Sequence, residues 1–227
     1  MSRKLTDYTT AAERSDLDIL IKVGVSVSAY KAAMTRLGFS LGSIYPVSEH
    51  WPVLLVSTSE DADFLTKGFM DALTQRQIPF KLAVFWNNHY QINGDSVAPI
   101  TQKYLQDGWQ YSRSVVLLKS VISGSCVVRT NLLALLAEID VAFLERILVA
   151  APVMFTGGEA RLKADFPSEI ANKFEFLTFA LDDERSPDGR VIPGIGGEIY
   201  GHLGLADQPA RLPNGYMPDV VSRLVFS

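Results

Sequence analysis

The sequence predicts an α/β protein with a mostly parallel sheet flanked by helices. Two observations lead to this class. Five apolar runs of strand length alternate with segments of helical periodicity, and this alternation is typical of parallel strands joined by right-handed crossovers. Of the 227 residues, 48% are hydrophobic and 20% are charged, which is the composition of an ordinary globular chain with a substantial core.

The first 46 residues are less regular than the rest. Residues 1–16 are polar, and we expect them to be loosely held. An apolar series with spacings of three and four residues follows, at Leu20, Val23, Val27, Tyr30, Met34 and Leu37. This series favours one continuous amphipathic helix that ends at Gly38. The alternation over 21–27, together with Gly24, leaves open a short strand followed by a helix from near Ser28.

From residue 52 the pattern becomes regular. The predicted strands are 52–57, 78–86, 112–120, 145–153 and 173–181. The helices predicted between them are 59–77, 98–107, 126–138 and 157–166. Ser57, Thr58 and Ser59 can cap the first of these helices, and Gly108 can end the second. We expect a polar turn or loop over 87–96.

Composition and charge exclude several classes of function. The single cysteine, Cys126, excludes an internal disulfide and fits a reducing compartment, and with only three histidines it argues against a Cys/His zinc site. A net charge of −4 argues against broad affinity for nucleic acids or anionic membranes. No apolar run has the length of a membrane span, and the amino terminus has no apolar signal core. We therefore expect a soluble, cytoplasmic protein.

Three loops are expected to meet at one edge of the sheet, because parallel α/β proteins bind ligands beyond the carboxyl ends of their strands. They are 119–125, 151–159 and 189–198. The strongest signal among them is Thr156-Gly157-Gly158, between a predicted strand and a predicted helix. Two glycines permit a sharp turn with inward N–H groups, and the helix amino terminus adds partial positive charge, which together form an anion site. The alternative is that the motif is only a tight strand-to-helix connection.

The segment 147–162, ILVAAPVMFTGGEARL, resembles the phosphoribosyl-binding loop of type I phosphoribosyltransferases, above all the uracil phosphoribosyltransferases. In that family an apolar strand leads into Asp-Pro-Met-Leu-Ala-Thr-Gly-Gly-Ser, and Pro152 and Thr156-Gly157-Gly158 match it in register. Downstream, 179–204 is similar to the family's closing segment, an acidic cluster followed by Gly-Tyr-Ile-Val-Pro-Gly-Leu-Gly-Asp. The matching residues there are Asp182, Asp183, Gly189, Val191, Ile192, Pro193, Gly194 and Gly196. Upstream, 115–125 stands where the family has its pyrophosphate loop, and Gly124 is the clear match.

The resemblance implies a type I phosphoribosyltransferase-like fold, with a helical extension over 1–46 and the α/β domain over 47–227. It assigns phosphate binding to Thr156, Gly157, Gly158 and Glu159. It assigns the pyrophosphate loop to Lys119, Ser123, Gly124 and Ser125. It assigns main-chain recognition of the base, which needs a rigid and closely approaching backbone, to Val191, Ile192, Pro193, Gly194 and Gly196. Magnesium would be required if the protein transfers phosphoribosyl groups.

The departures from the family concern its charged groups. The aspartate that holds the ribose hydroxyls falls on Ala151, and the arginine of the pyrophosphate loop falls on Ile122. The hydroxyl residue that completes the phosphate loop falls on Glu159, whose charge would repel a bound phosphate. The aspartate of the closing segment falls on Gly197, and only 139–145 stands where the family has a mobile hairpin. Phosphoribosyl transfer needs these charges and a lid that excludes water, so we assign no catalytic residue.

We therefore expect a uracil-phosphoribosyltransferase-like protein that keeps a nucleobase or nucleotide pocket. The missing charges predict no robust uracil phosphoribosyltransferase activity, and transfer through a divergent set of residues stays open. The alternative is a non-catalytic ligand-sensing or assembly subunit built on the same fold. The apolar series from Leu20 to Leu37 also predicts a homo-oligomer in which this series is shared between subunits. The alternative is that the series packs against its own domain.

Three further features have two interpretations each. The acidic run 182–184 could bind a cation or form a solvated turn. Lys119 could meet an anionic ligand or lie on the surface. Trp86, His89 and Tyr90 could stack on a base or pack in the core. The glycines of 194–201 imitate a dinucleotide-binding fingerprint, but no strand–helix–strand unit follows them, which argues against that function.

Overall fold

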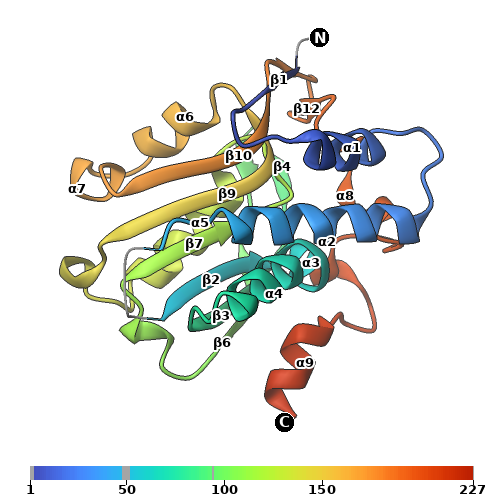
Figure 1. Cartoon of the computed structure of the whole chain (residues 1–227). Coiled ribbons are helices and arrows are strands. Elements are labelled where there is room, and N and C mark those ends of the chain that lie inside the picture. Colours follow the sequence, from blue (N-terminus) through green and yellow to red (C-terminus); the bar gives the residue numbers. More distant parts are fainter. Residues whose placement is uncertain (1–2, 48–51, 94, 227) are drawn as a thin grey trace.

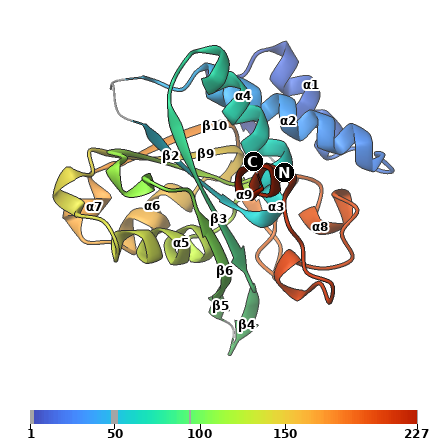
Figure 2. The same ribbon diagram turned by 90° about the horizontal axis from the view of Figure 1, so that it is seen from below.

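The structure is a computed structural model that describes residues 3–47, 52–93 and 95–226. It confirms the predicted α/β class: a mostly parallel sheet lies between two layers of helices (Figures 1 and 2). The strands of this sheet are β1 (Arg3–Leu5), β2 (Val53–Thr58), β3 (Phe80–Asn87), β6 (Ile100–Leu105), β7 (Ser114–Leu118), β8 (Val121–Ile122), β9 (Arg146–Phe155) and β10 (Phe174–Asp182). Two small hairpins lie outside it, β4 (Tyr90–Ile92) with β5 (Asp95–Val97), and β11 (Glu184–Arg185) with β12 (Val191–Ile192).

The strands are paired in the order β1-β10-β9-β7-β2-β3-β6, and β8 pairs with β9. Neighbours from β10 to β3 are parallel, whereas β1 and β6 are antiparallel edge strands. The five parallel strands are the five predicted ones, within two residues at each end. From β2 the chain moves outward to β3, and it later returns to place β7 on the other side of β2. The sheet therefore changes its winding direction between β2 and β7, and open α/β sheets bind ligands at such a switch point.

Helices cover both faces of the sheet (Figure 2). On one face lie α1 (Ala11–Leu20), α2 (Val27–Ser43), α3 (Ser59–Asp61) and α4 (Lys67–Gln75), with a π-helical turn (Ala62–Thr66) between the last two. On the other face lie α5 (Cys126–Leu136), α6 (Gly158–Ala164) and α7 (Ser168–Ala171). The carboxyl-terminal part of the chain forms α8 (Ile199–His202) and α9 (Asp219–Val225). None of the helices in the described ranges has both the length and the apolar character to cross a membrane.

The core has two layers because successive side chains of a strand point to opposite faces. Leu55 and Val84 belong to the layer beneath α2, and Leu54 and Phe85 belong to the layer beneath α5. All four are buried. Burial on both faces explains why these parallel strands read as plain apolar runs in the sequence.

One predicted helix is wrong. Residues 98–107 contain the strand β6, which pairs antiparallel with β3. Gln102 and Lys103 are good helix formers, but the open edge of β3 offers a ladder of backbone hydrogen bonds, and this tertiary pairing overrides the local preference. The loop predicted over 87–96 is also partly regular, because β4 and β5 form a hairpin there.

The predictions for the amino-terminal segment need correction as well. Loose packing over 1–16 is wrong for the described residues, because β1 pairs with β10 and α1 begins at Ala11 behind the cap Thr10. The continuous helix over 20–37 is wrong too, because Gly24 adopts a φ of +72° in a turn between α1 and α2. A helix start near Ser28 is right: α2 begins at Val27 behind the cap Ser26, although 21–25 forms a turn and no strand.

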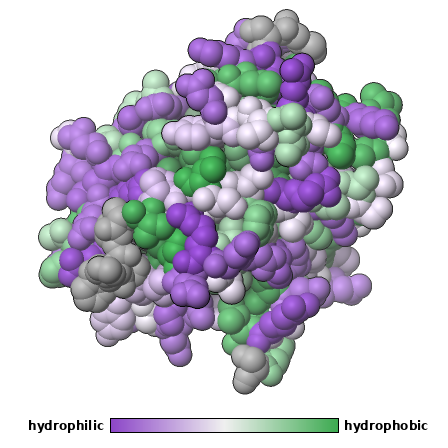
Figure 3. Space-filling view, viewed as in Figure 1, coloured by the Kyte–Doolittle hydropathy of each residue, from purple (hydrophilic) through white to green (hydrophobic). Residues whose placement is uncertain are grey.

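The apolar series of this segment faces the chain's own core. Leu20, Tyr30, Met34 and Leu37 are buried, whereas Val23 in the turn is 97% exposed. Figure 3 shows hydrophilic and hydrophobic residues mixed over the face that α1, α2 and α4 cover. The series therefore does not supply the subunit contact expected of it, and the homo-oligomer stays a prediction.

Candidate functional site

A cleft of about 1100 Å³ lies at the carboxyl edge of the parallel strands. It is lined by the hairpin β4–β5, the loop after β7 with the first turn of α5, α6, the hairpin β11–β12 and the start of α8. Glu60 of α3 lines it as well. Because α3 follows β2 directly, the cleft includes the switch point between β2 and β7.

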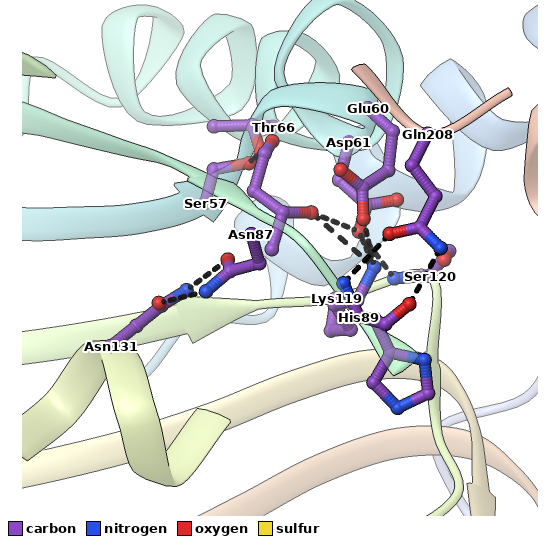
Figure 4. Close-up of polar contacts among 11 residues, drawn as sticks. Ser57, Glu60, Asp61, Thr66, Asn87, His89, Lys119, Ser120, Asn131 and Gln208 are labelled. Atoms are coloured by element: carbon purple, nitrogen blue, oxygen red, sulfur yellow. Dashed lines mark hydrogen bonds and ion pairs between the residues drawn. The ribbon is translucent and has the colours of Figure 1, made fainter. Parts of the chain in front are cut away.

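A buried ion cluster lies at this switch point (Figure 4). The ammonium of Lys119, just after β7, lies 2.6 Å from Asp61 Oδ2, 2.9 Å from Glu60 Oε1 and 3.3 Å from Thr58 Oγ1. The side chains of Lys119, Glu60 and Asp61 are 14%, 8% and 0% exposed. We call Thr58, Glu60, Asp61 and Lys119 the switch-point cluster.

The switch-point cluster keeps the side chain of Lys119 positively charged. Burial by itself lowers the pKa of the ammonium, but the charges of Asp61 and Glu60 outweigh burial and raise this pKa above its ordinary value. One positive and two negative charges give the cluster a formal net charge of −1. Lys119 is therefore not a surface lysine, and its charge is already engaged before any ligand arrives.

Three buried oxygens close to the cluster in sequence have no hydrogen-bond partner within the described residues. They are Asp61 Oδ1, Ser59 Oγ and Ser120 Oγ. Ser120 lines the cleft, and its backbone N–H donates to Asp61 Oδ2 at 3.3 Å. Since buried polar atoms are normally satisfied, the Ser120 hydroxyl is available to a small polar ligand or to water.

The loop after β7 leads directly into the amino terminus of α5. Ser123, Gly124 and Ser125 all line the cleft. Ser125 occupies the capping position of α5, yet its hydroxyl makes no capping hydrogen bond. The uncapped N–H groups of the first helical turn and the helix dipole favour an anion at this point. Reciprocal amide hydrogen bonds of 2.8 and 3.0 Å between Asn87 and Asn131 hold α5 against the end of β3 (Figure 4).

The charges of the cleft are unevenly distributed along the sheet edge. Glu60 follows β2, whereas Arg161 of α6 and Arg185 of β11 follow β9 and β10, two and three strands away. Neighbouring strands lie about 4.8 Å apart, so the ends of β2 and β10 are separated by about 14 Å. We call the Glu60 side of the cleft the acidic end and the side of Arg161 and Arg185 the basic end; Asp165, Asp188 and Glu198 also line the cleft.

The structure brings together only part of the predicted site. The predicted residues that line the cleft are Lys119, Ser123, Gly124, Ser125 and Val191. The predicted residues that are not among its lining residues are Thr156, Gly157, Gly158, Glu159, Ile192, Pro193, Gly194 and Gly196. The binding roles assigned to both sets stay predictions.

Close packing accounts for the two glycines after β9. Gly157 has a φ of −87°, which any residue adopts, but a Cβ there would lie 2.8 Å from the ring of Phe155. A Cβ on Gly158 would lie 3.3 Å from side-chain atoms of Ile122 and Met154. The glycines therefore fit a tight strand-to-helix connection, the alternative that the sequence left open.

The two residues that flank these glycines, Thr156 and Glu159, interact with other parts of the chain. Thr156 is exposed, and its backbone N–H donates to Asp182 O at 3.0 Å. Glu159 is exposed and forms an ion pair of 2.7 Å with Lys163, one turn further along α6. The repulsion expected of Glu159 is therefore not directed into the cleft.

The segment after β10 is held by the protein itself. Arg3 donates to both carboxylate oxygens of Asp182 at 2.8 Å and also to Gly194 O. Asp182 Oδ2 in turn accepts from Gly194 N at 2.8 Å. At positive φ, a Cβ on Gly194 would lie 2.3 Å from Val191 O, and one on Gly196 would lie 2.3 Å from the backbone of α1. Asp182 is thus neither a cation ligand nor part of a solvated turn, and both glycines serve contacts within the chain.

The aromatic residues at the end of β3 separate into two roles. Trp86 is buried, and its indole N–H donates to Tyr216 O at 2.7 Å, which confirms core packing for this residue. His89 and Tyr90 line the cleft. The amide of Gln208 holds the backbone of His89 through two hydrogen bonds of 2.7 Å (Figure 4). Burial lowers the pKa of the His89 ring, which keeps it neutral at pH 7.

The lining residues that sequence reasoning missed include Glu60, Arg161, Arg185 and Tyr200. The signal for Glu60 was present, because it stands two residues after the end of a buried strand. Arg161 and Arg185 follow the predicted strands 145–153 and 173–181 by eight and four residues, but no local motif marks them.

Comparison with known proteins gives a likeness of fold alone. No protein-family model and no curated protein matches the chain. Among solved structures, the AQ2163 protein from Aquifex aeolicus has a TM-score of 0.67 and 11% identity, over 90% of this chain and 99% of that one. Hypoxanthine-guanine phosphoribosyltransferase from L. donovani has a TM-score of 0.44 and 8% identity, over 71% and 82% of the two chains. Hypoxanthine phosphoribosyltransferase from Trypanosoma cruzi has a TM-score of 0.43 and 8% identity, over 76% and 79%. Similarity at this level carries no conclusion about activity, ligand or assembly.

Proposed function

We propose that this protein binds a nucleobase or a nucleotide in the cleft, and that it does not transfer phosphoribosyl groups. It then acts as a ligand-binding or ligand-sensing protein, with uracil and its nucleotides as the first candidates. The observation that carries the proposal is the position of the cleft over the switch point and the amino terminus of α5.

Support for an anionic group comes from the loop after β7. Ser123, Gly124 and Ser125 bring the uncapped start of α5 to the cleft, where a phosphate can accept hydrogen bonds from backbone N–H groups. The hydroxyl of Ser120, buried and without a protein partner among the described residues, adds a donor beside this loop. This is the same kind of anion site that the sequence placed after β9, one strand further along the sheet.

Support for a base comes from the side chains near the acidic end. Tyr200 and His89 line the cleft together with Ile195 and Ile199, and such side chains give ring faces and apolar contacts to a planar base. Burial raises the pKa of the Tyr200 hydroxyl, which stays a neutral hydrogen-bond donor at pH 7. The preference for uracil depends on the resemblance of 191–196, of which Val191 and Ile195 reach the cleft.

The loss of transfer is supported by the switch-point cluster. Phosphoribosyl transfer develops positive charge at the sugar and negative charge on the leaving pyrophosphate, and both need charges held ready for them. Here Lys119 is already neutralised by Glu60 and Asp61. The net charge of −1 disfavours a pyrophosphate group at the switch point itself, and the carboxylates are bound to the lysine instead of facing a sugar.

Calorimetric titration with uracil, uridine and UMP, and with AMP and GMP as a purine set, tests binding. Ser125→Asp places a carboxylate at the capping position of α5, where it stabilises the helix but repels an anion. Ser125→Asn is the uncharged control of almost the same shape. We expect Ser125→Asp to abolish nucleotide binding and Ser125→Asn to preserve it. Thr156→Asp adds the same charge after β9 and should leave binding unchanged.

A second assay measures turnover of uracil with phosphoribosyl pyrophosphate and magnesium. We expect no product above background, because the charges that transfer requires are absent or engaged. Product formed at an ordinary enzymatic rate would contradict the loss of transfer. If none of the five ligands binds the native protein at millimolar concentration, the nucleotide pocket itself is wrong.

A further inference from the structure

Two arginines from different elements converge at the basic end of the cleft. The guanidinium carbon of Arg161 lies 6.0 Å from the centre of the Phe155 ring, and that of Arg185 lies 5.4 Å from the same centre. Both residues line the cleft. Burial, and after it the charge of Arg161, lowers the pKa of Arg185. Both guanidinium groups thus lie against the same aromatic ring.

Neither guanidinium has a carboxylate partner among the residues that the structure describes. Acidic residues lie in the same region: Asp183 and Glu184 precede Arg185 in the chain, and Glu198 also lines the cleft. Asp165 lines the cleft one turn after Arg161 but forms no ion pair with it, and Arg129 adds a further positive charge from α5. The nearby Arg190 is neutralised by Asp188 at 2.7 Å. Arg161 and Arg185 are therefore two guanidinium groups of the cleft that form no ion pair among the described residues.

Contacts with neighbouring residues define the positions of the two arginines. Gly157 leaves room for the Phe155 ring, since a Cβ there would lie 2.8 Å from the ring. Arg185 donates from Nε and Nη2 to Gly189 O at 3.2 and 3.1 Å, which fixes its planar group. Its Nη2 lies 3.9 Å from the position of a Cβ on Gly124, so the guanidinium stands beside the loop that leads into α5.

We propose that Arg161 and Arg185 bind a phosphate group of the ligand, so that the cleft selects phosphorylated compounds over their phosphate-free counterparts. Guanidinium groups suit this task because they present paired N–H donors to phosphate oxygens and remain charged at any physiological pH. The phosphate would accept from both arginines and from the N–H groups at the start of α5. This inference rests on the proposed function and names the group that the cleft recognises. If Glu159 repelled the phosphate, phosphate-free ligands would bind more tightly than phosphorylated ones; we expect the opposite order.

The test titrates inorganic pyrophosphate, uridine and UMP into the native protein and into Arg161→Gln, Arg185→Gln and Lys163→Gln. Lys163→Gln is the matched control, because it removes one positive charge from the same helix α6 at a residue that does not line the cleft. We expect each arginine variant to weaken pyrophosphate and UMP binding about tenfold or more, and Lys163→Gln to leave both unchanged. Uridine should bind native protein and variants alike, more weakly than UMP binds the native protein.

Folding of the variants is checked by circular dichroism and thermal unfolding. Arg161 is exposed, so Arg161→Gln should fold as the native protein does even if Arg185→Gln does not. Unchanged UMP binding in folded Arg161→Gln and Arg185→Gln would overturn the inference while leaving the nucleotide pocket intact. Equal affinities of the native protein for uridine and UMP would also overturn the inference and leave the nucleotide pocket intact. Arginine-dependent pyrophosphate binding without any binding of nucleosides or nucleotides would support the anion pair and reject the proposed function instead.

Discussion

Replacing Lys119 with methionine removes the cation from the switch-point cluster and nearly preserves the length of the side chain. Glu60 and Asp61, whose side chains are 8% and 0% exposed, then face each other without the ammonium that lies 2.9 and 2.6 Å from them in the native protein. Two buried carboxylates without a cation are strongly disfavoured.

The expected loss of stability follows from this burial. Removing one partner of a buried ion pair costs about 3–5 kcal/mol. For a chain of this length, each kcal/mol lowers the melting temperature by about 2–4 °C, so we expect a fall of about 6–20 °C. The control is Lys67→Met, which breaks an exposed ion pair with Asp71 and should cost less than about 1 kcal/mol.

The loss also depends on pH in a defined direction. The pKa of Lys119 is raised in the folded protein, so its stabilising charge is fully present below the ordinary lysine pKa of about 10.4 and is lost only above the raised value. The native cluster is therefore unaffected between pH 5 and pH 8 by titration of this lysine. The stabilisation that Lys119 contributes should therefore be lost only in strongly alkaline solution, above its raised pKa.

Urea and thermal unfolding measure these differences. The double variant Lys119→Met with Asp61→Asn should recover part of the stability, because it removes one of the two uncompensated charges. A Lys119→Met protein as stable as Lys67→Met, or losses from Lys119→Met and Asp61→Asn that simply add, would refute the description of this cluster as a tightly coupled buried set.

Three further predictions concern other parts of the chain. Asp182→Asn should cost about 3 kcal/mol or more in urea unfolding, because it leaves Arg3 without its buried partner; a change below that of a typical surface substitution would contradict this. Gly194→Val should lower the melting temperature even without ligand, because its Cβ would lie 2.3 Å from Val191 O; a native-like melting curve would contradict the contact. Burial raises the pKa of the Cys126 thiol, so alkylation at pH 7 should be slower than for a free thiol and slower still with UMP present; alkylation unaffected by UMP would count against a ligand in the cleft.

The central strands could be predicted because burial on both faces makes them continuous apolar runs. β6 could not, because an edge strand has one partner and exposed polar side chains, and Gln102 and Lys103 favour a helix locally. The end of α1 and the start of α2 could not be predicted for a different reason. The turn around Gly24 contains valines whose spacing continues the helical series, although Val23 is 97% exposed.

The site was harder to predict than the fold because strand order is not written in local sequence. The loops after β7, β9 and β10 could all be placed at one edge, but only the pairing of β2 with both β3 and β7 identifies the switch point. The motif of Thr156 and two glycines gave the stronger local signal, yet Gly157 and Gly158 lie close against side chains of the protein itself. A glycine marks a close approach, and the sequence does not say whether a ligand or the chain itself approaches.

Glu60, Arg161 and Arg185 were missed, and the partners of Lys119 were not foreseen, because the residues that meet in the cleft are distant in sequence. Lys119 binds Glu60 and Asp61, which are about sixty residues away in the sequence. Arg161 and Arg185 come from different elements and both lie against the ring of Phe155. Neither hydrophobic periodicity nor motif spacing predicts contacts between residues so far apart in the sequence. Their significance appears only when the sheet brings the ends of β2, β7, β9 and β10 to the same edge.

The most direct test of the proposed function is a crystal structure of the protein grown with UMP at millimolar concentration. We predict that the phosphate lies at the amino terminus of α5 within hydrogen-bonding distance of Arg185, and that the base points toward Tyr200. UMP bound at Thr156–Gly158 instead, or a cleft that stays empty at saturating UMP, would contradict both the placement of the site and the function proposed for it.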